Sequence, residues 1–260
     1  MAKPVMVVTT GDPVPRVAEE RGDFARLIEE AIGTAWDGRF DAFDARHLPG
    51  PDPEGAAAYV ITGSAAHVQD REPWVVRTEA WLRCVVTAGV PTLGICFGHQ
   101  LLAQALGGEV HRNPRGREIG TVEIERLGDD PLFDGLPPRF GANATHLDSV
   151  LRLPPGTVVL ARSSLEHHQA LRFAPACYGV QFHPEIDGQV MQRYLEARRE
   201  VLKAESIDAD ALMATVGDAP EGRRVIENFF RHVVAHRAAL PRPQPGPQSA
   251  EPRGTPDRFR

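Results

Sequence analysis

The stretch PTLGICFGHQLL, residues 91–102, decides the fold of this 260-residue chain. A short apolar run leads into Gly94, Cys96 stands between Gly94 and Gly98, and a helix-forming run follows at once. This order predicts a strand, a very tight turn and a helix, because small residues on both sides let the backbone turn sharply around a reactive side chain. The pattern is typical of a nucleophile elbow with Cys96 at its tip.

The predicted position at the start of a helix also favours a reactive thiol. Unpaired N–H groups and the helix dipole at this end stabilise an anion, and therefore stabilise the thiolate relative to the thiol. The N–H of Phe97 points into the same space in such a turn and is available to bind an oxyanion. A buried structural cysteine is the usual alternative, but the flanking glycines favour the elbow.

The composition is that of an ordinary soluble globular protein. Charged residues make up 25% and hydrophobic residues 42% of the chain, and the length allows one large domain or two small ones. A formal net charge of -6 argues against a nucleic-acid-binding surface. No run approaches the roughly 18 apolar residues that indicate a membrane span.

The cysteines are few and far apart. Cys84, Cys96 and Cys177 form no C-x-x-C pair, so neither a zinc site nor a redox pair is expected. A reduced, cytoplasmic setting is the simpler inference, and the N-terminal apolar run is too short for a signal peptide. Cys84 and Cys177 stand in apolar contexts and are expected to be inert.

The N-terminal part of the chain alternates between strand and helix patterns. Strands are predicted at residues 5–10, 40–46, 58–62 and in the elbow, and helices at 24–32 and 73–88. Such alternation implies right-handed β-α-β units and a parallel sheet that is covered on both faces. Ligands bind outside the carboxyl ends of such strands. The loop at Gly63 and Ser64, as well as Cys96, falls at this edge.

The rest of the chain changes character twice. Short β-rich runs at 118–126, 157–162, 169–173 and 178–182 predict antiparallel additions to the sheet, and helices are expected at 187–204, 208–216 and 220–239. From residue 241 onward the chain is rich in proline and lacks the apolar surface needed to fold. We therefore expect one domain over 1–240, with a disordered tail at 241–260.

A second motif supplies a base for Cys96. The segment YGVQFHPE, residues 178–185, places His183 at the end of a predicted strand, and Pro184 stops further pairing there. Glu185 can return its carboxylate to the imidazole and fix the tautomer. A cysteine nucleophile needs a base, and the base needs an orienting group. The sequence thus predicts a Cys96, His183 and Glu185 triad.

Together, GICFGHQ at 94–100 and QFHPE at 181–185 resemble the class I glutamine amidotransferases. The resemblance covers roughly residues 5–185 and implies a flavodoxin-like three-layer α/β sandwich with a mostly parallel central sheet and antiparallel additions. It implies that Cys96 is the nucleophile, that His183 acts first as base and then as acid, and that Glu185 orients His183. Other cysteine-elbow α/β proteins share the sheet but do not call for the His-Pro-Glu strand end.

The resemblance extends to oxyanion and substrate residues. The ITGS segment at 61–64 resembles the oxyanion loop of the family, so that the Gly63 N–H joins that of Phe97. THLDSV at 145–150 resembles the segment that contacts bound glutamine. The substrate-binding residues implied in this way are Ser64, Gln100, His146, Leu147 and Asp148. The implied reaction releases ammonia from L-glutamine through a cysteine thioester, and it requires no metal and no cofactor.

Other histidines allow weaker interpretations. His99 could be a second base, but inside the elbow helix it is expected to pack or to hydrogen-bond locally. His146 with Asp148 could form a second base and orienter, although a substrate-binding role is favoured. The His167 and His168 pair suggests a metal site only weakly, because adjacent residues in a strand face opposite sides.

Two departures from the family pattern limit the functional prediction. The sequence has no G-x-x-x-x-G-K-[ST] loop and is too short to include a synthetase, so we expect a free-standing glutaminase domain with a possible synthetase partner that accepts ammonia. The segment at about 187–220 is a helical insertion, which we expect to form a flap or a partner surface. A γ-glutamyl peptidase or hydrolase and a low-activity binding or regulatory protein remain as alternatives.

Overall fold

The computed structural model describes residues 2–236, and the predicted tail at 241–260 lies outside them. A nine-stranded sheet in the order β2-β1-β3-β4-β11-β10-β9-β6-β7 forms the centre, and β5 pairs with β8 in a small second sheet. The strands are β1 Val5–Thr9, β2 Phe40–Asp44, β3 Ala58–Ile61, β4 Thr92–Ile95, β5 Glu109–Arg112, β6 Glu118–Arg126, β7 Arg139–His146, β8 Asp148–Arg152, β9 Val158–Arg162, β10 Ala170–Ala174 and β11 Cys177–Val180.

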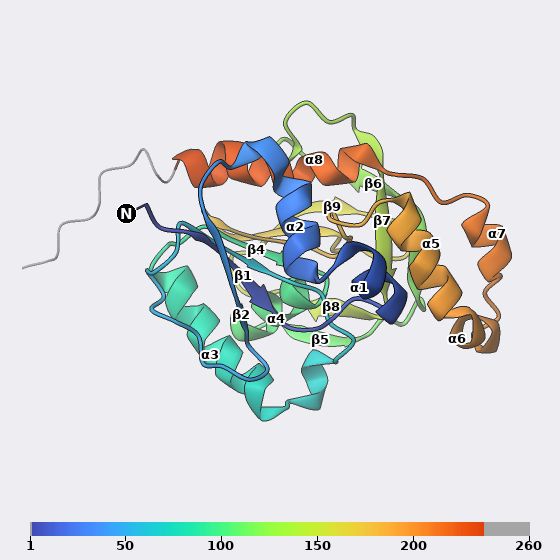
Figure 1. Ribbon diagram of the computed structural model, residues 1–260, viewed down its shortest axis with the longest axis horizontal. Helices are drawn as coiled ribbons and strands as arrows, with labels where there is room; N and C mark the ends of the chain where they lie inside the picture. The colour runs from blue at the N-terminus through green and yellow to red at the C-terminus, as the bar shows by residue number, and fades with distance from the viewer. Residues whose placement is uncertain (1, 237–260) are drawn as a thin grey trace, which may run out of the picture.

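The helices cover both faces of this sheet and one of its ends (Figure 1). They are α1 Pro15–Arg21, α2 Phe24–Ile32, α3 Pro73–Thr87, α4 Phe97–Ala105, α5 Gly188–Ala197, α6 Arg199–Ala204, α7 Ala209–Met213 and α8 Pro220–Asn228, which continues as a π-helix over Phe229–Val234. In Figure 1, α2 and α8 lie above the sheet and α3 below it, while α5, α6 and α7 lie at its right-hand end.

Three apolar clusters explain these layers. Residues of α2 and α8 pack on one face of the sheet, with Ile28 and Phe229 fully buried. Residues of α3 and α4 pack on the other face, with Leu82 and Leu101 fully buried. A third cluster joins α1 and α5 around Met191. The longer helices α2, α3, α5 and α8 each bury several residues on one side, as amphipathic helices in layered α/β proteins do.

The sheet is mixed in the way that the sequence predicts. β1 pairs in parallel with β2 and β3, and β4 pairs in parallel with β3 and β11. From β11 outward, the pairs through β10, β9, β6 and β7 are antiparallel. The predicted α/β class with antiparallel additions is confirmed. The register pairs Val180 with Ile95, which brings the chain before His183 beside the chain before Cys96.

Several local predictions were wrong. The helix α1, which begins at Pro15, was not predicted, nor were β5, β7 and β8, which are not signalled by alternating apolar residues. The predicted helix over 187–204 is two helices that meet at Arg198. The strand before His183 ends at Val180 rather than at Phe182. Residues 237–239 of the last predicted helix lie outside the described part.

Candidate active site

The turn between β4 and α4 is the predicted elbow. Cys96 has φ 50° and ψ −100°, a conformation that side chains rarely adopt and that costs about 1–3 kcal/mol. A Cβ atom at Gly94 would lie 2.5 Å from the carbonyl carbon of Gly98, and one at Gly98 would lie 2.5 Å from the carbonyl oxygen of Ile61. Both positions therefore require glycine, as the motif predicts.

His183 is held in place from its backbone and from its ring. Its N–H donates to the carbonyl oxygen of Asn143 at 2.8 Å, and its Nδ1 lies 2.7 Å from Oε1 of Glu185. Because a carboxylate can only accept, Nδ1 carries the proton and Nε2 is the free nitrogen. Within residues 2–236, Nε2 has no hydrogen-bond partner, and Cys96 is one of the groups that act electrostatically on His183.

The electrostatics favour a thiolate and an imidazolium. Burial raises the pKa of the Cys96 thiol, but the neighbouring His183 outweighs this effect, so the pKa is lower than that of an ordinary thiol. Burial lowers the pKa of His183, but the charges of Glu185 and Cys96 outweigh it and raise that pKa. The two groups titrate as a pair. The arrangement is able to attack an electrophilic carbon near neutral pH.

The loop after β3 lies against His183. A Cβ at Gly63 would fall 2.9 Å from Cε1 of His183, so the missing side chain makes room for the imidazole. The carbonyl oxygen of Thr62 accepts the N–H of Gly98 at 3.1 Å and the hydroxyl of Thr10 at 2.9 Å. The trans peptide between Thr62 and Gly63 is thereby fixed, and its N–H points away from these donors.

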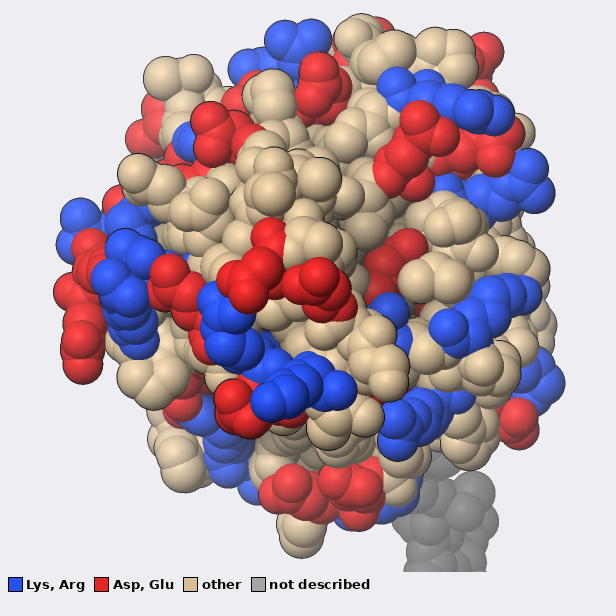
Figure 2. Space-filling model, turned by 90° about the vertical axis from the view of Figure 1, so that its right-hand side faces the viewer, with Lys and Arg blue, Asp and Glu red and all other residues tan. Residues whose placement is uncertain are grey.

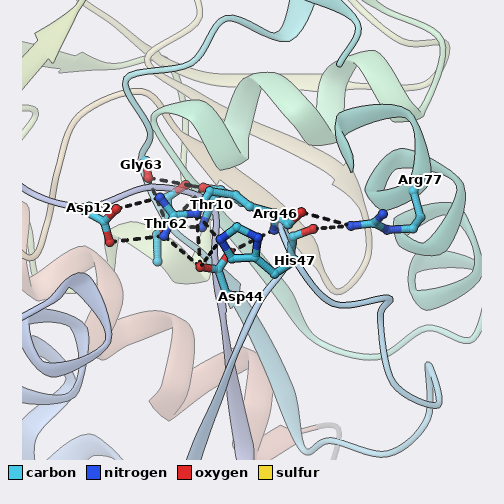
Figure 3. A network of polar contacts seen from close by, with 9 residues as sticks. Thr10, Asp12, Asp44, Arg46, His47, Thr62, Gly63 and Arg77 are labelled. Carbon is cyan, nitrogen blue, oxygen red and sulfur yellow. Dashed lines mark hydrogen bonds and ion pairs between the residues drawn. The ribbon is translucent and has the colours of Figure 1, made fainter. Parts of the chain in front are cut away.

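Figure 3 shows that this loop belongs to a wider polar network at the carboxyl ends of β1, β2 and β3. The hydroxyl groups of Thr10 and Thr62 lie 3.2 Å and 3.0 Å from the carbonyl oxygen of Gly63. Arg46 pairs with Asp12 at 2.6 Å and with Asp44 at 2.7 Å. The loop that carries the predicted oxyanion donor is therefore held by the side chains of Thr10 and Thr62.

A cavity of ≈ 240 Å³ opens beside Cys96. Its lining includes every residue predicted to bind substrate, together with Cys96, Phe97 and seven residues that were not predicted to belong to the site. The predicted residues are Ser64, Cys96, Phe97, Gln100, His146, Leu147 and Asp148, and the added ones include His67, Arg117, Arg198 and Val201. The size suits a ligand smaller than the drug-sized ligands of typical pockets.

The predicted substrate residues are tied to one another. Gln100 donates through Nε2 to the carbonyl oxygen of Asp148 and to Gln181, both at 3.0 Å. His146 lies 3.0 Å from Glu118 through Nε2; burial lowers the pKa of His146, but this hydrogen bond outweighs it and raises the pKa. His146 is thus held by a carboxylate of its own, and the structure does not bring it into the Cys96 and His183 pair.

The two carboxylate oxygens of Asp148 differ in their hydrogen bonding. Its Oδ2 lies 2.6 Å from Nδ1 of His67 and accepts from Gln69 at 3.1 Å. Its Oδ1 is buried and has no hydrogen-bond partner in the part of the chain that is described. A buried carboxylate oxygen without a donor is costly, and a bound cationic group would satisfy it.

The other histidines considered in the sequence do not line the cavity. His99 is fully buried against Phe173, and burial lowers its pKa to about 3. His167 and His168 lie in a turn, not in a strand. Across residues 2–236, no group of three His, Cys, Asp or Glu is placed to hold a metal ion.

The two other cysteines differ from each other. The prediction of an apolar setting holds for Cys177, which is buried, and burial raises the pKa of its thiol. The prediction was wrong for Cys84, which is exposed because it lies on the outer side of α3. Cys84 is therefore a natural reference thiol for experiments on Cys96.

The chain matches a known protein family. Residues 52–200 match the family model described as "Glutamine amidotransferase class-I". The match covers more than half of the chain, and the chain therefore belongs to the class I glutamine amidotransferase family.

Among its relatives are GMP synthases and their subunits. The chain is 38% identical over 167 residues to the glutamine-hydrolysing GMP synthase subunit of Ignicoccus hospitalis, covering 64% of this chain and 85% of that protein. It is 47% identical over 98 residues to the corresponding protein from Pyrococcus abyssi, covering 37% of this chain and 52% of the relative. It is 41% identical over 147 residues to the glutamine-hydrolysing GMP synthase of Aeropyrum pernix, covering 56% of this chain. The match spans about half of the Pyrococcus protein and 26% of the Aeropyrum protein.

Solved structures confirm the fold. A glutamine amidotransferase from Thermotoga maritima superposes with a TM-score of 0.69 and 24% identity, covering 91% of this chain and 98% of that one. A glutamine amidotransferase from Methylobacillus flagellatus superposes with a TM-score of 0.66 and 23% identity, covering 96% and 100%. In the described part of the chain, every helix is too short or too polar to cross a bilayer.

Proposed function

We propose that this protein hydrolyses the side-chain amide of L-glutamine through a thioester on Cys96 and releases ammonia. The observation that carries the proposal is the buried pair of His183 and Glu185, with Nδ1 of His183 at 2.7 Å from Oε1 of Glu185, together with the effect of His183 on the buried thiol of the elbow, Cys96. Such an order of orienter, base and nucleophile supports covalent acyl transfer on many unrelated folds.

In the first step, the Cys96 thiolate attacks the amide carbon of the substrate. The carbon–sulfur bond forms, and the carbonyl oxygen becomes an oxyanion. His183, protonated on both nitrogens, gives its Nε2 proton to the departing nitrogen, so that the carbon–nitrogen bond breaks and ammonia leaves. Glu185 stabilises the imidazolium before this transfer and holds the ring in the required orientation.

Two backbone N–H groups support the oxyanion in this proposal. The N–H of Phe97 is free of intrahelical bonding because it belongs to the first turn of α4. The N–H of Gly63 is directed by the fixed carbonyl oxygen of Thr62. Loss of one oxyanion donor costs about 10²–10³ in kcat, so the geometry of this loop has a large expected effect on turnover.

In the second step, His183 takes a proton from water, and the resulting hydroxide attacks the thioester. The carbon–sulfur bond breaks, glutamate leaves, and the thiolate and imidazolium are restored. Asp148 is the proposed partner of the substrate ammonium group, because its Oδ1 lacks a donor inside the cavity. Gln100 and His146 line the same cavity and are further substrate-binding residues that the family resemblance implies.

In this proposal, a separate synthetase accepts the released ammonia. Two relatives are by name subunits of a glutamine-hydrolysing GMP synthase, which supports a role as the ammonia-supplying partner of a separate synthetase. Release of ammonia to solvent in the absence of any partner would instead support an independent hydrolase.

A trapping experiment tests the proposal. We expect a glutamine-analogue electrophile such as a diazo-ketone to label one site, identified by peptide mass spectrometry as Cys96, and Cys96→Ala to abolish both labelling and ammonia release. Cys84→Ala is the matched control, because it removes an exposed thiol and leaves the cavity intact. Labelling that persists in Cys96→Ala would refute the assignment.

A further inference from the structure

The inserted helices contribute one cation to the active-site cavity. Arg198 lies where α5 ends and α6 begins, and it lines the cavity together with Val201 of α6. Neither residue belongs to the elbow or the His-Pro-Glu motif. Both residues belong to the segment after Asp187, and this segment therefore forms one wall of the cavity.

Glu205 is the carboxylate that acts on Arg198, but it is bound to another arginine. The other cavity arginine, Arg117, lies 2.8 Å from one oxygen of Glu205 and donates to the second oxygen at 3.0 Å. Arg198 forms no ion pair with any carboxylate of residues 2–236, although carboxylates and arginines are interspersed over this face of the molecule (Figure 2). A cation that lines a cavity without a counter-ion has capacity for an anionic ligand.

The guanidinium of Arg198 is also held in place before any ligand binds. It lies 5.4 Å from the ring centroid of Tyr194, one turn earlier in α5, and Tyr194 is itself buried. Stacking on an aromatic face suits the planar guanidinium and leaves its N–H groups free along the edge. The group therefore loses little rotational freedom when it binds a planar carboxylate.

The cavity is complementary to a small zwitterion. Arg198 supplies a positive charge, and Asp148 supplies a carboxylate oxygen that has no donor among the described residues. The volume of ≈ 240 Å³ suits an amino acid or a compound little larger. An α-amino acid presents an ammonium and a carboxylate on one carbon, and a γ-glutamyl amino acid carries a second carboxylate on its leaving group.

We propose that Arg198 is a specificity-determining residue that binds a carboxylate of the substrate. This inference rests on the proposed amide hydrolysis at Cys96 and adds to it the group that selects an anionic substrate. The carboxylate is either the α-carboxylate of the glutamyl half or the carboxylate of a leaving amino acid, and both have the same chemistry toward a guanidinium.

Kinetics with three substrates separate the two sources of carboxylate. L-Glutamine, γ-glutamylmethylamide and γ-glutamylglycine share the α-carboxylate, and γ-glutamylglycine alone carries one on the leaving group. We expect Arg198→Met to raise KM about tenfold to a hundredfold, with kcat little changed, because a charge-assisted hydrogen bond is lost equally from ground and transition states. A rise for all three identifies the α-carboxylate, and a rise for γ-glutamylglycine alone identifies the leaving group.

Matched variants exclude a general effect of charge or folding. Arg199→Met removes the neighbouring arginine, which pairs with Asp210 outside the cavity, and it should leave KM unchanged. Arg198→Lys keeps the charge and should restore part of the affinity. Circular dichroism and the thermal midpoint of each variant show whether it is folded. Equal KM values in Arg198→Met and Arg199→Met, or a fall in kcat alone, would overturn the inference.

A second readout does not depend on glutamine turnover. Iodoacetate carries a carboxylate and iodoacetamide does not, while both alkylate a thiolate with loss of iodide. The ratio of their rates at Cys96 should fall at least fivefold in Arg198→Met and stay constant in Arg199→Met. If the wild-type protein hydrolyses none of the three amides, the proposed function fails, and this ratio still decides whether Arg198 selects carboxylates. An unchanged ratio would reject the role of Arg198.

Discussion

Substitution of Gly98 by alanine tests whether the elbow depends on close backbone approach. Gly98 is the second residue of α4, where alanine is normally favoured over glycine by about 1 kcal/mol. In this structure, the added Cβ would lie 2.5 Å from the carbonyl oxygen of Ile61 and 2.8 Å from its Cβ. The usual gain in helix propensity therefore competes with a clash against β3.

We expect the clash to outweigh the gain in helix propensity. A contact of 2.5 Å falls well below the 3.4 Å at which ordinary contact begins, so α4 and β3 must separate by a large part of an ångström. Overpacking of this kind costs about 1–3 kcal/mol. The N–H of Gly98 also donates to the carbonyl oxygen of Thr62, so the shift moves the oxyanion loop relative to Cys96. A displacement near 1 Å at a reacting centre can cost about 10²-fold in rate.

Thermal unfolding and ammonia release measure the two effects. We expect Gly98→Ala to lower Tm by about 2–4 °C for each kcal/mol of lost stability and to lower kcat/KM by roughly 10²-fold. Gly128→Ala is the matched control, because no heavy atom lies within 4 Å of its added Cβ, and it should be neutral or slightly stabilising. A Gly98→Ala protein that is as stable and as active as the control would refute the reasoning.

Three further results are expected. Because its pKa is lowered by His183, Cys96 should be alkylated by iodoacetamide with a pH midpoint below the value of about 8.5 for a free thiol, and His183→Gln should move that midpoint upward; equal midpoints would contradict the ion pair. Thr10→Val should lower kcat about tenfold at constant KM, as expected when a transition-state contact is loosened, and Thr10→Ser should restore it; unchanged kcat in Thr10→Val would show that the loop needs no such support. Because burial lowers the pKa of His99 to about 3, the unfolded state binds the extra proton first, and stability should fall below about pH 6.5 by up to about 1.4 kcal/mol per pH unit. Denaturant titrations of His99→Leu should show a shallower decline, and an identical decline would contradict the assignment.

Elements that are marked by a pattern of neighbouring residues were predicted from the sequence. The elbow follows from glycines on either side of Cys96, and α2 follows from apolar residues at helical spacing with Gly33 after its last turn. The pairing of Cys96 with His183 was also predictable, because a parallel sheet brings the carboxyl ends of its strands to one edge. These inferences needed no knowledge of distant packing.

Elements without a periodic signal were missed for identifiable reasons. β7 is buried along almost its whole length, so polar and apolar residues do not alternate, and its small residues resemble a loop. α1 has seven residues and only Val17 is buried, which leaves no apolar stripe to detect. Both depend on tertiary packing rather than on local propensity.

The cavity arginines could not be predicted for a different reason. Nothing in the sequence near Arg198 distinguishes it from the other arginines of α5 and α6. Its position depends on how α5 and α6 pack through the third apolar cluster around Met191 and Leu202. Only the folded arrangement separates an arginine that lines the cavity from its neighbour Arg199, which pairs with Asp210.

The placement of β11 directly beside β4 determines when Cys96 and His183 are brought together. Cys96 and His183 lie far apart in the chain and come together only when the strand that leads to His183 is inserted between β4 and β10. A chain that is still being synthesised, or one in which β11 has come away, carries Cys96 without His183 beside it. Under the proposed mechanism, the thiol is therefore activated only in the completed sheet.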